Sequence, residues 1–217
     1  MIELLLSILI AYLIGSISFG LLAGYLIHNI DIRNYGSGSA GSTNVLRVIG
    51  KPSAAIVLLL DISKAIIYLQ LLNFLLPNNT PLISTLSALA LLSGHIWPIY
   101  FKFNGGRGIA PGLGALLIIN PIIGILSFLI AIIVMIVSRY VSFGSIIGTL
   151  FGAISLSFVS FFNLPFNLPM TNNEPIEALY AILGAILVIW SHRENIKRLL
   201  NKTESKLGEK IKVKTNE

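Results

Sequence analysis

The chain carries glycine-rich polar segments whose residue types suit the binding of anions. The first reads GSGSAGSTNVLRVIGK, from Gly36 to Lys51, and combines glycines and hydroxyl side chains with Asn44 and Arg47. Glycines let the backbone fold closely around an anion, so that successive N–H groups point at it. The glycines match GxGxxG, but a dinucleotide fingerprint follows a strand in a βαβ unit. An apolar, helix-length segment precedes this loop, so we predict an anion site of another kind.

A second segment, GHIWPIYFKFNGGRGIAPG, spans Gly94 to Gly112 and places Lys102 and Arg107 among glycines at the start of a predicted helix. These glycines are Gly105, Gly106 and Gly108. Glycine backbone, a helix N-terminus and cations together favour anion binding. The alternative is a positively charged membrane anchor with a helix breaker. His95 lies deeper and is interpreted as a structural histidine.

Two shorter segments add polar groups. SRYVSFGS, from Ser138 to Ser145, contributes Ser142, and SHRENIKRL, from Ser191 to Leu199, contributes His192 and Asn195. The ordinary pKa of histidine suits proton transfer near neutrality. His192 is therefore a candidate for acid–base chemistry.

Other charged residues have a structural interpretation. Glu194 can pair with Lys197 or Arg198, three and four residues on. Asp61 and Lys64 share one face of an apolar segment, where charges are costly and usually paired or functional. We interpret them as a structural pair, with a substrate contact as the alternative.

The segments that must position these residues are strongly apolar. The 217 residues are 55% hydrophobic and 11% charged, with a mean hydropathy of +0.86, outside the usual range of soluble domains. Glu3 and the absence of a basic start argue against a removable signal peptide. The apolar stretches span about 2–27, 53–76, 82–100, 109–137, 143–164 and 176–190. Asn120-Pro121 divides the fourth, because proline disfavours helix in the residue before it.

We therefore predict an all-α integral membrane protein with about seven transmembrane helices, one of them a short segment after the glycine loop. Basic residues favour cytoplasmic loops. Seven crossings place every Lys and Arg except Lys64 on one face, whereas six would move Arg139 and the basic tail outside. The N-terminus is then outside and the C-terminus cytoplasmic. Residues 1–195 form one transmembrane domain, and 196–217 a basic tail that is partly amphipathic or disordered.

Several classes of function are disfavoured. The chain has no cysteine, and its three histidines are too scattered for a zinc motif, so we expect no metal and no disulfide. The pI of about 9.7 could suggest nucleic acid, but the charge lies beside membrane segments, where anionic lipid is the expected partner.

Three segments, GSGSAGSTNVLRVIGK, GHIWPIYFKFNGGRGIA and SHRENIKRL, resemble in order and spacing the motifs of the bacterial acyl-phosphate:glycerol-3-phosphate acyltransferases. The resemblance extends to about Leu200. It implies an inner-membrane enzyme without a cofactor, facing the cytoplasm, that acylates the 1-hydroxyl of sn-glycerol 3-phosphate from acyl phosphate. The implied products are lysophosphatidic acid and phosphate, opening phospholipid synthesis. Contact with the enzyme that supplies acyl phosphate would fit this role.

From this implied chemistry we hypothesise roles for individual residues. Ser37 and Gly38 would stabilise the reacting carbonyl by backbone N–H or hydroxyl. The phosphates would be held by Asn44, Arg47, Lys102, Ser142, His192 and Asn195, with Gly105, Gly106, Arg107 and Gly108 around the acyl phosphate. The proton acceptor would be His192 or a substrate phosphate oxygen, and an acyl-enzyme on Ser37 is a further alternative. The family usually has lysines at the positions of Asn104 and Arg107 and a threonine at that of Pro111, so roles there are open.

Two rival functions are considered. Glycine, serine and charge within helices are compatible with a transporter of a small anionic substrate, but the sequence shows no convincing internal repeat. An acyl-CoA-dependent acyltransferase with an H-x4-D pair is the other rival. None of His28, His95 and His192 has an aspartate five positions on.

Overall fold

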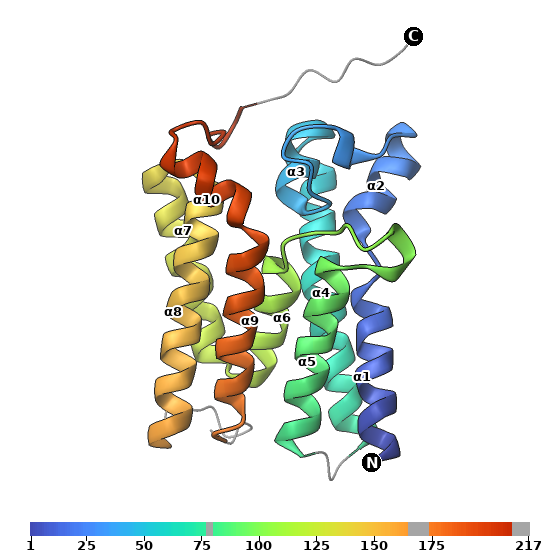
Figure 1. Ribbon diagram of the computed structural model, residues 1–217, viewed down its shortest axis with the longest axis vertical. Coiled ribbons are helices and arrows are strands. Elements are labelled where there is room, and N and C mark those ends of the chain that lie inside the picture. The colour runs from blue at the N-terminus through green and yellow to red at the C-terminus, as the bar shows by residue number, and fades with distance from the viewer. Residues whose placement is uncertain (77–79, 165–173, 210–217) are drawn as a thin grey trace.

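The protein is an all-helical bundle in the computed structural model, which describes residues 1–76, 80–164 and 174–209 and contains no strand within them (Figure 1). The α-helices are α1 (Ile2–Gly15), α2 (Phe19–His28), α3 (Ser42–Val48), α4 (Lys51–Leu75), α5 (Pro81–Ile96), α6 (Ile109–Ile119), α7 (Pro121–Ser138), α8 (Val141–Phe162), α9 (Glu177–Ser191) and α10 (Arg193–Leu200). Two short 3-10 helices, η1 (Ile32–Asn34) and η2 (Ile99–Phe101), lie in the loops. The predicted all-α class is confirmed.

Five helical segments within the described residues are long and apolar enough to cross a bilayer. They are 2–28, 51–75, 81–101, 121–138 and 141–162. The shorter apolar helices α6 and α9 occupy the other two segments for which crossings were predicted. The number of seven membrane crossings and the orientation of the chain in the membrane stay predictions.

The first apolar segment is divided, although the sequence predicts one continuous helix. α1 ends at Gly15 and α2 begins at Phe19, with buried serines between them. The ammonium group of Lys64 donates to the carbonyl oxygens of Gly15 and Ile17, at 3.1 and 2.8 Å. A cation from α4 therefore satisfies backbone groups that a helix break would leave unpaired in an apolar environment.

The predicted division at Asn120-Pro121 is present. α6 ends at Ile119 and α7 begins at Pro121, and the Asn120 side chain accepts a hydrogen bond from the N–H of Ile123 at 3.1 Å. Proline suits the first turn of a helix, where its missing N–H has no intrahelical partner.

Glycines allow the helices to approach closely. A Cβ on Gly15 would overlap the Leu91 carbonyl, one on Gly94 would overlap the Tyr12 carbonyl, and one on Gly114 would overlap the Ile62 carbonyl. These contacts hold α1 against α5 and α4 against α6. Small residues at such interfaces are typical of membrane helices.

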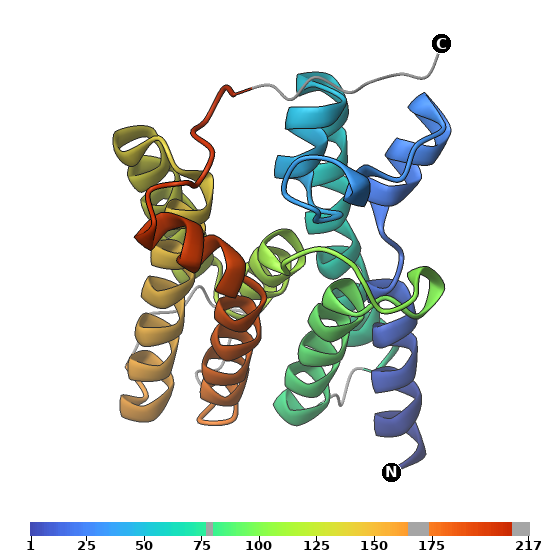
Figure 2. The same ribbon diagram turned by 45° about the horizontal axis from the view of Figure 1, so that its top comes forward.

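The polar segments gather at the end of the bundle opposite the N-terminus (Figures 1 and 2). α10, predicted as the start of a longer amphipathic helix, ends at Leu200, and 201–209 continue without helix. Instead, the Leu207 N–H donates to the Arg139 carbonyl at 2.7 Å. The basic residues at 210–214 and the predicted opposite loops at 77–79 and 165–173 lie outside the described residues.

Candidate active site

A polar cavity lies at the end of the bundle where the four polar segments meet. Its lining includes Ser37, Asn44, Arg47, Asp61, His95, Arg107, Gly108, Ser142, His192 and Glu204. Most predicted site residues are thus brought together by loops far apart in sequence. Gly38, Lys102, Gly105, Gly106 and Asn195 are not part of the lining.

Asn44 is buried and organises the first loop. Its Oδ1 accepts from the Ser37 N–H at 2.9 Å, and its Nδ2 donates to the carbonyls of Ile32 and Tyr35 at 2.8 and 3.1 Å. The Gly38 N–H also donates to Tyr35. Both N–H groups are thus used within the loop in this structure, and a role for Ser37 and Gly38 at the substrate carbonyl stays a prediction. The Ser37 hydroxyl is the group that remains at the cavity.

The glycine loop is fixed against the end of α5. The N–H groups of Gly105 and Gly106 donate to the carbonyls of Ile96 and His95 at 3.1 and 3.0 Å, and the Gly105 carbonyl accepts from Ala40 in the first loop. A Cβ on Gly106 would overlap the His95 imidazole. Both glycines thus position the loop by close packing, while Gly108 begins α6 with a left-handed φ of 84°.

Arg107 and Lys102 have different environments. Arg107 lines the cavity, and burial, followed by repulsion from Arg198, lowers its pKa to about 10, so it remains charged at neutral pH. Lys102 is exposed and is not among the residues that line the cavity. Pro111 lies in the first turn of α6, where the lack of an N–H costs little. Proline at position 111, where the motif in the sequence analysis usually has threonine, is therefore compatible with the fold.

A carboxylate from the tail joins the third and fourth segments. Glu204 accepts from Ser142 Oγ at 2.9 Å, from Asn195 Nδ2 at 2.8 Å and from Arg198 Nε at 2.7 Å. Burial raises the pKa of Glu204, but these hydrogen bonds outweigh it and hold that pKa below its usual value. Asn195 thus reaches the cavity indirectly, through Glu204.

Removal of the Glu204 charge is expected to destabilise this corner of the site. In Glu204→Gln, a neutral amide faces Arg198, and one of its two ends no longer accepts a hydrogen bond. We expect a loss of about 1–3 kcal/mol in unfolding free energy, measured as a lower Tm in detergent. The exposed Glu209→Gln is the control. Equal Tm values for the two variants would contradict this role.

His192 is buried between α9 and α10. Its Nδ1 lies 2.8 Å from the Val188 carbonyl, which can only accept, so Nδ1 carries the proton and Nε2 is left as an acceptor. Burial, which outweighs the hydrogen bond to Val188, lowers the pKa of His192 to about 4. The side chain is therefore neutral at physiological pH.

We expect His192 to take up a proton only near pH 4. Because its folded pKa lies below the ordinary value of 6.5, protonation favours the unfolded state, and stability falls as pH drops from about 6.5 toward 4. Nuclear magnetic resonance of protein with ¹⁵N-labelled histidine, assigned by comparison with His192→Gln, measures the midpoint. A midpoint above 6 would contradict the buried, neutral imidazole.

Asp61 and His95 line the cavity, and together with Lys64 they form a buried cluster of ionisable side chains. Lys64 Nζ lies 2.8 Å from Asp61 Oδ1 and 3.1 Å from His95 Nδ1. All three side chains are less than a tenth exposed. The cluster connects the α1–α2 break with the histidine that supports the glycine loop. Glu194, in contrast, is exposed and lies 3.1 Å from Lys197.

Sequence reasoning missed two residues. Glu204 was counted only as part of the basic tail, since no local pattern indicates that it folds back onto Ser142. Arg33 was counted only as a loop cation. Its guanidinium contacts Asp31 and donates to the carbonyls of Phe101 and Asn104 at 2.9 Å, joining the first two loops.

Fold and site together define a multi-pass helical membrane protein with a cationic pocket at one end of the bundle. The family model described as "Glycerol-3-phosphate acyltransferase" matches residues 5–202. Curated relatives of that name include one from Thermoanaerobacter sp. (strain X514), 41% identical over 96% of this chain and 98% of the relative. Another, from Clostridioides difficile (strain 630), is 38% identical over 93% and 94%.

Two solved structures are similar over most of their length. Both are of PlsY (YgiH), an integral membrane glycerol 3-phosphate acyltransferase. The glycerol 3-phosphate form has a TM-score of 0.82 and 34% identity, covering 94% of this chain and 96% of that one. The lysophosphatidic acid form has a TM-score of 0.80 and 32% identity, covering 95% and 96%. The chain belongs to the glycerol-3-phosphate acyltransferase family, and it is a membrane acyltransferase of phospholipid biosynthesis.

Proposed function

We propose that this enzyme transfers a fatty acyl group from acyl phosphate to the 1-hydroxyl of sn-glycerol 3-phosphate, giving lysophosphatidic acid and phosphate. The observation that carries the proposal is the polar cavity, which is lined by two arginines, Arg47 and Arg107. This cavity shares lining residues with an apolar chamber. Such a site suits two anionic phosphates, one with an acyl chain. The solved relatives in glycerol 3-phosphate and lysophosphatidic acid forms support this choice.

The reaction needs positioning more than covalent help from the protein. The 1-hydroxyl oxygen attacks the acyl carbonyl carbon, the bond from that carbon to the bridging oxygen breaks, and phosphate leaves. Arg107 and Arg47 would hold the phosphates, and the Ser37 hydroxyl would donate to the carbonyl oxygen as its negative charge grows. The hydroxyl proton must pass to an acceptor.

We assign that acceptor to a phosphate oxygen of the donor. A general base works best when its pKa is near the working pH. The pKa of His192 is about 4, whereas the second pKa of a phosphate monoester is about 6. His192 would then orient a substrate through Nε2. On this assignment no covalent acyl-enzyme forms on Ser37.

The cavity would face the cytoplasm of a bacterial inner membrane. All described Lys and Arg residues except the buried Lys64 belong to the loops and helix ends at one end of the bundle, which the positive-inside rule assigns to the cytoplasm. An enzyme that supplies acyl phosphate could reach the site there. Impermeant labelling of a single cysteine at exposed Lys102, in intact and opened cells, tests the orientation.

The donor is tested by phosphate release from purified protein. With palmitoyl phosphate and glycerol 3-phosphate, we expect lysophosphatidic acid and phosphate in equal amounts. Palmitoyl-CoA serves as the comparison donor under the same conditions. A preference for palmitoyl-CoA would overturn the donor assignment, while the family would stand.

A further inference from the structure

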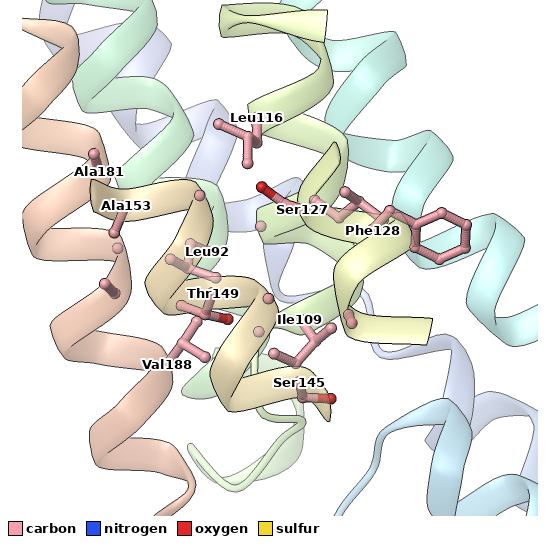
Figure 3. A pocket seen from close by; sticks show the side chains of 18 of the residues that line it. Leu92, Ile109, Leu116, Ser127, Phe128, Ser145, Thr149, Ala153, Ala181 and Val188 are labelled. Carbon is pink, nitrogen blue, oxygen red and sulfur yellow. The ribbon is translucent and has the colours of Figure 1, made fainter. Parts of the chain in front are cut away.

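An apolar chamber extends from the polar cavity toward the middle of the bundle, between α6, α7, α8 and α9 (Figure 3). The two spaces share lining residues, among them Gly108, Ile109 and Ser145. Figure 3 shows Ser145 near one end and Leu116 and Ser127 at the other. A ligand held by its phosphate in the polar cavity can therefore extend an acyl chain into the chamber.

The chamber wall includes glycines that packing does not require. A Cβ on Gly112 or Gly184 would meet Leu92 and Tyr180 atoms no closer than 3.7 Å, which is ordinary contact. Alanine would fit at both positions, and helical glycine costs up to about 1 kcal/mol relative to alanine. Gly15, by contrast, faces a carbonyl that leaves no room for a Cβ. The glycine at 184 thus keeps space open inside the chamber.

The inner end of the chamber is closed by side chains. A Cβ on Gly152 would lie 2.7 Å from Ser127 Oγ and 3.1 Å from Leu116 Cδ2, so α6, α7 and α8 meet tightly there. The Ser127 hydroxyl donates to the Ile123 carbonyl at 2.6 Å. The hydroxyl hydrogen of Ser127 is therefore used within α7 and needs no partner in an apolar ligand.

Leu116 and Gly184 lie at similar depths. Leu116 is about two helical turns beyond Gly108, and Gly184 is about two turns before His192, so each lies about 12 Å along its helix from a residue that lines the polar cavity beside Arg107. An extended hydrocarbon advances about 1.2 Å per bond, since three backbone bonds span about 3.3–3.6 Å. A chain that starts at the level of Gly108 and His192 therefore extends by about ten bonds before it reaches these residues.

We propose that Gly184 and Leu116 determine the acyl-chain length that the enzyme prefers, Gly184 by leaving the wall open and Leu116 by closing the inner end. This inference rests on the proposed function. Bulk at position 184 would exclude the distal part of a long chain while a shorter chain still fits. Loss of bulk at position 116 would lengthen the chamber and favour longer chains.

A competition assay tests the proposal. Purified full-length protein receives equal amounts of decanoyl and hexadecanoyl phosphate with glycerol 3-phosphate, and mass spectrometry gives the ratio of the two lysophosphatidic acids. Because the donors compete in one mixture, this ratio reports the ratio of kcat/KM values and is independent of the amount of active enzyme. The variants are Gly184→Val, Gly184→Ala and Leu116→Ala, with Ile186→Ala on the exposed face of α9 as control.

In Gly184→Val we expect the hexadecanoyl-to-decanoyl ratio to fall by about tenfold, the scale of a methylene-sized misfit in an apolar pocket. Gly184→Ala should give a smaller fall and Leu116→Ala a rise, while Ile186→Ala should match the wild type. Ratios that stay constant in both Gly184 variants, or that move in the same direction in Gly184→Val and Leu116→Ala, would overturn the inference.

The result separates this inference from the proposed function. If the wild type acylates glycerol 3-phosphate only from acyl-CoA, the donor assignment fails, and the same ratios measured with decanoyl-CoA and hexadecanoyl-CoA decide the role of the chamber. If the wild type uses acyl phosphate but the ratios do not move, the chain-length inference fails alone.

Discussion

Replacement of Arg107 with leucine is expected to lower kcat/KM for glycerol 3-phosphate and acyl phosphate by about 100-fold or more. Arg107 lines the cavity and remains charged, although burial and its neighbour Arg198 lower its pKa to about 10. Loss of one partner of a buried charge pair costs about 2–5 kcal/mol, and each 1.4 kcal/mol is a factor of ten. Steady-state phosphate release across a range of both substrates measures the effect.

The control for Arg107→Leu is Lys102→Ala in the same loop. Lys102 is exposed and does not line the cavity, so its loss should change kcat/KM by less than about threefold, as is usual for exposed charges. Arg107→Lys should fall between the two, since it keeps the charge and loses the planar fork. Equal losses at positions 102 and 107 would show that net charge, and not the cavity, governs activity.

Replacement of Lys64 with methionine is expected to destabilise the protein by about 3–5 kcal/mol, because a buried carboxylate is left without its cation. Lys64 Nζ contacts Asp61 at 2.8 Å and satisfies the carbonyls of Gly15 and Ile17 at the α1–α2 break. The loss is measured as a lower Tm in detergent. Activity should fall too, because the same cluster supports His95 beneath the glycine loop.

A double variant distinguishes the ion pair from general damage. Lys64→Met with Asp61→Leu removes both charges, so it should recover part of the lost Tm, although the carbonyls at the break stay unsatisfied. Leu60→Met, on the exposed side of α4, should leave the Tm unchanged. A double variant less stable than Lys64→Met would indicate that Asp61 is stabilised by groups other than Lys64.

Much of the architecture could be predicted because hydropathy and proline act locally. Apolar segments in a bilayer form helices because lipid offers no hydrogen-bond partner to the backbone N–H and C=O groups. Asn120-Pro121 divides α6 from α7 as expected. The break between Gly15 and Phe19 could not be predicted, because the group that satisfies it, Lys64, comes from another helix. The break is stabilised only when α4 packs against α1 and brings Lys64 to these carbonyl groups.

The site shows the same division between local and long-range effects. Motif residues such as Arg47, Ser142 and His192 line one cavity. Their convergence was expected because the polar segments were predicted to lie on the same face of the membrane. The pattern could not show that Asn44 uses its amide to hold Ser37, since that hydrogen bond depends on the path of the folded loop. Lys102 and Arg107 are both cations in one loop, and only the fold directs Arg107 inward.

The sequence by itself determined the membrane environment, the all-helical class and the family, because each depends on residue type and spacing along the chain. Tertiary structure alone decided which polar atoms already have hydrogen-bond partners, that Glu204 folds back to Ser142 and Asn195, and that Leu116 lines an apolar chamber. The physical reason is that burial and hydrogen bonding are shared between segments far apart in sequence. The pKa of His192 illustrates this, because it follows from the packing around the imidazole and not from the residue type.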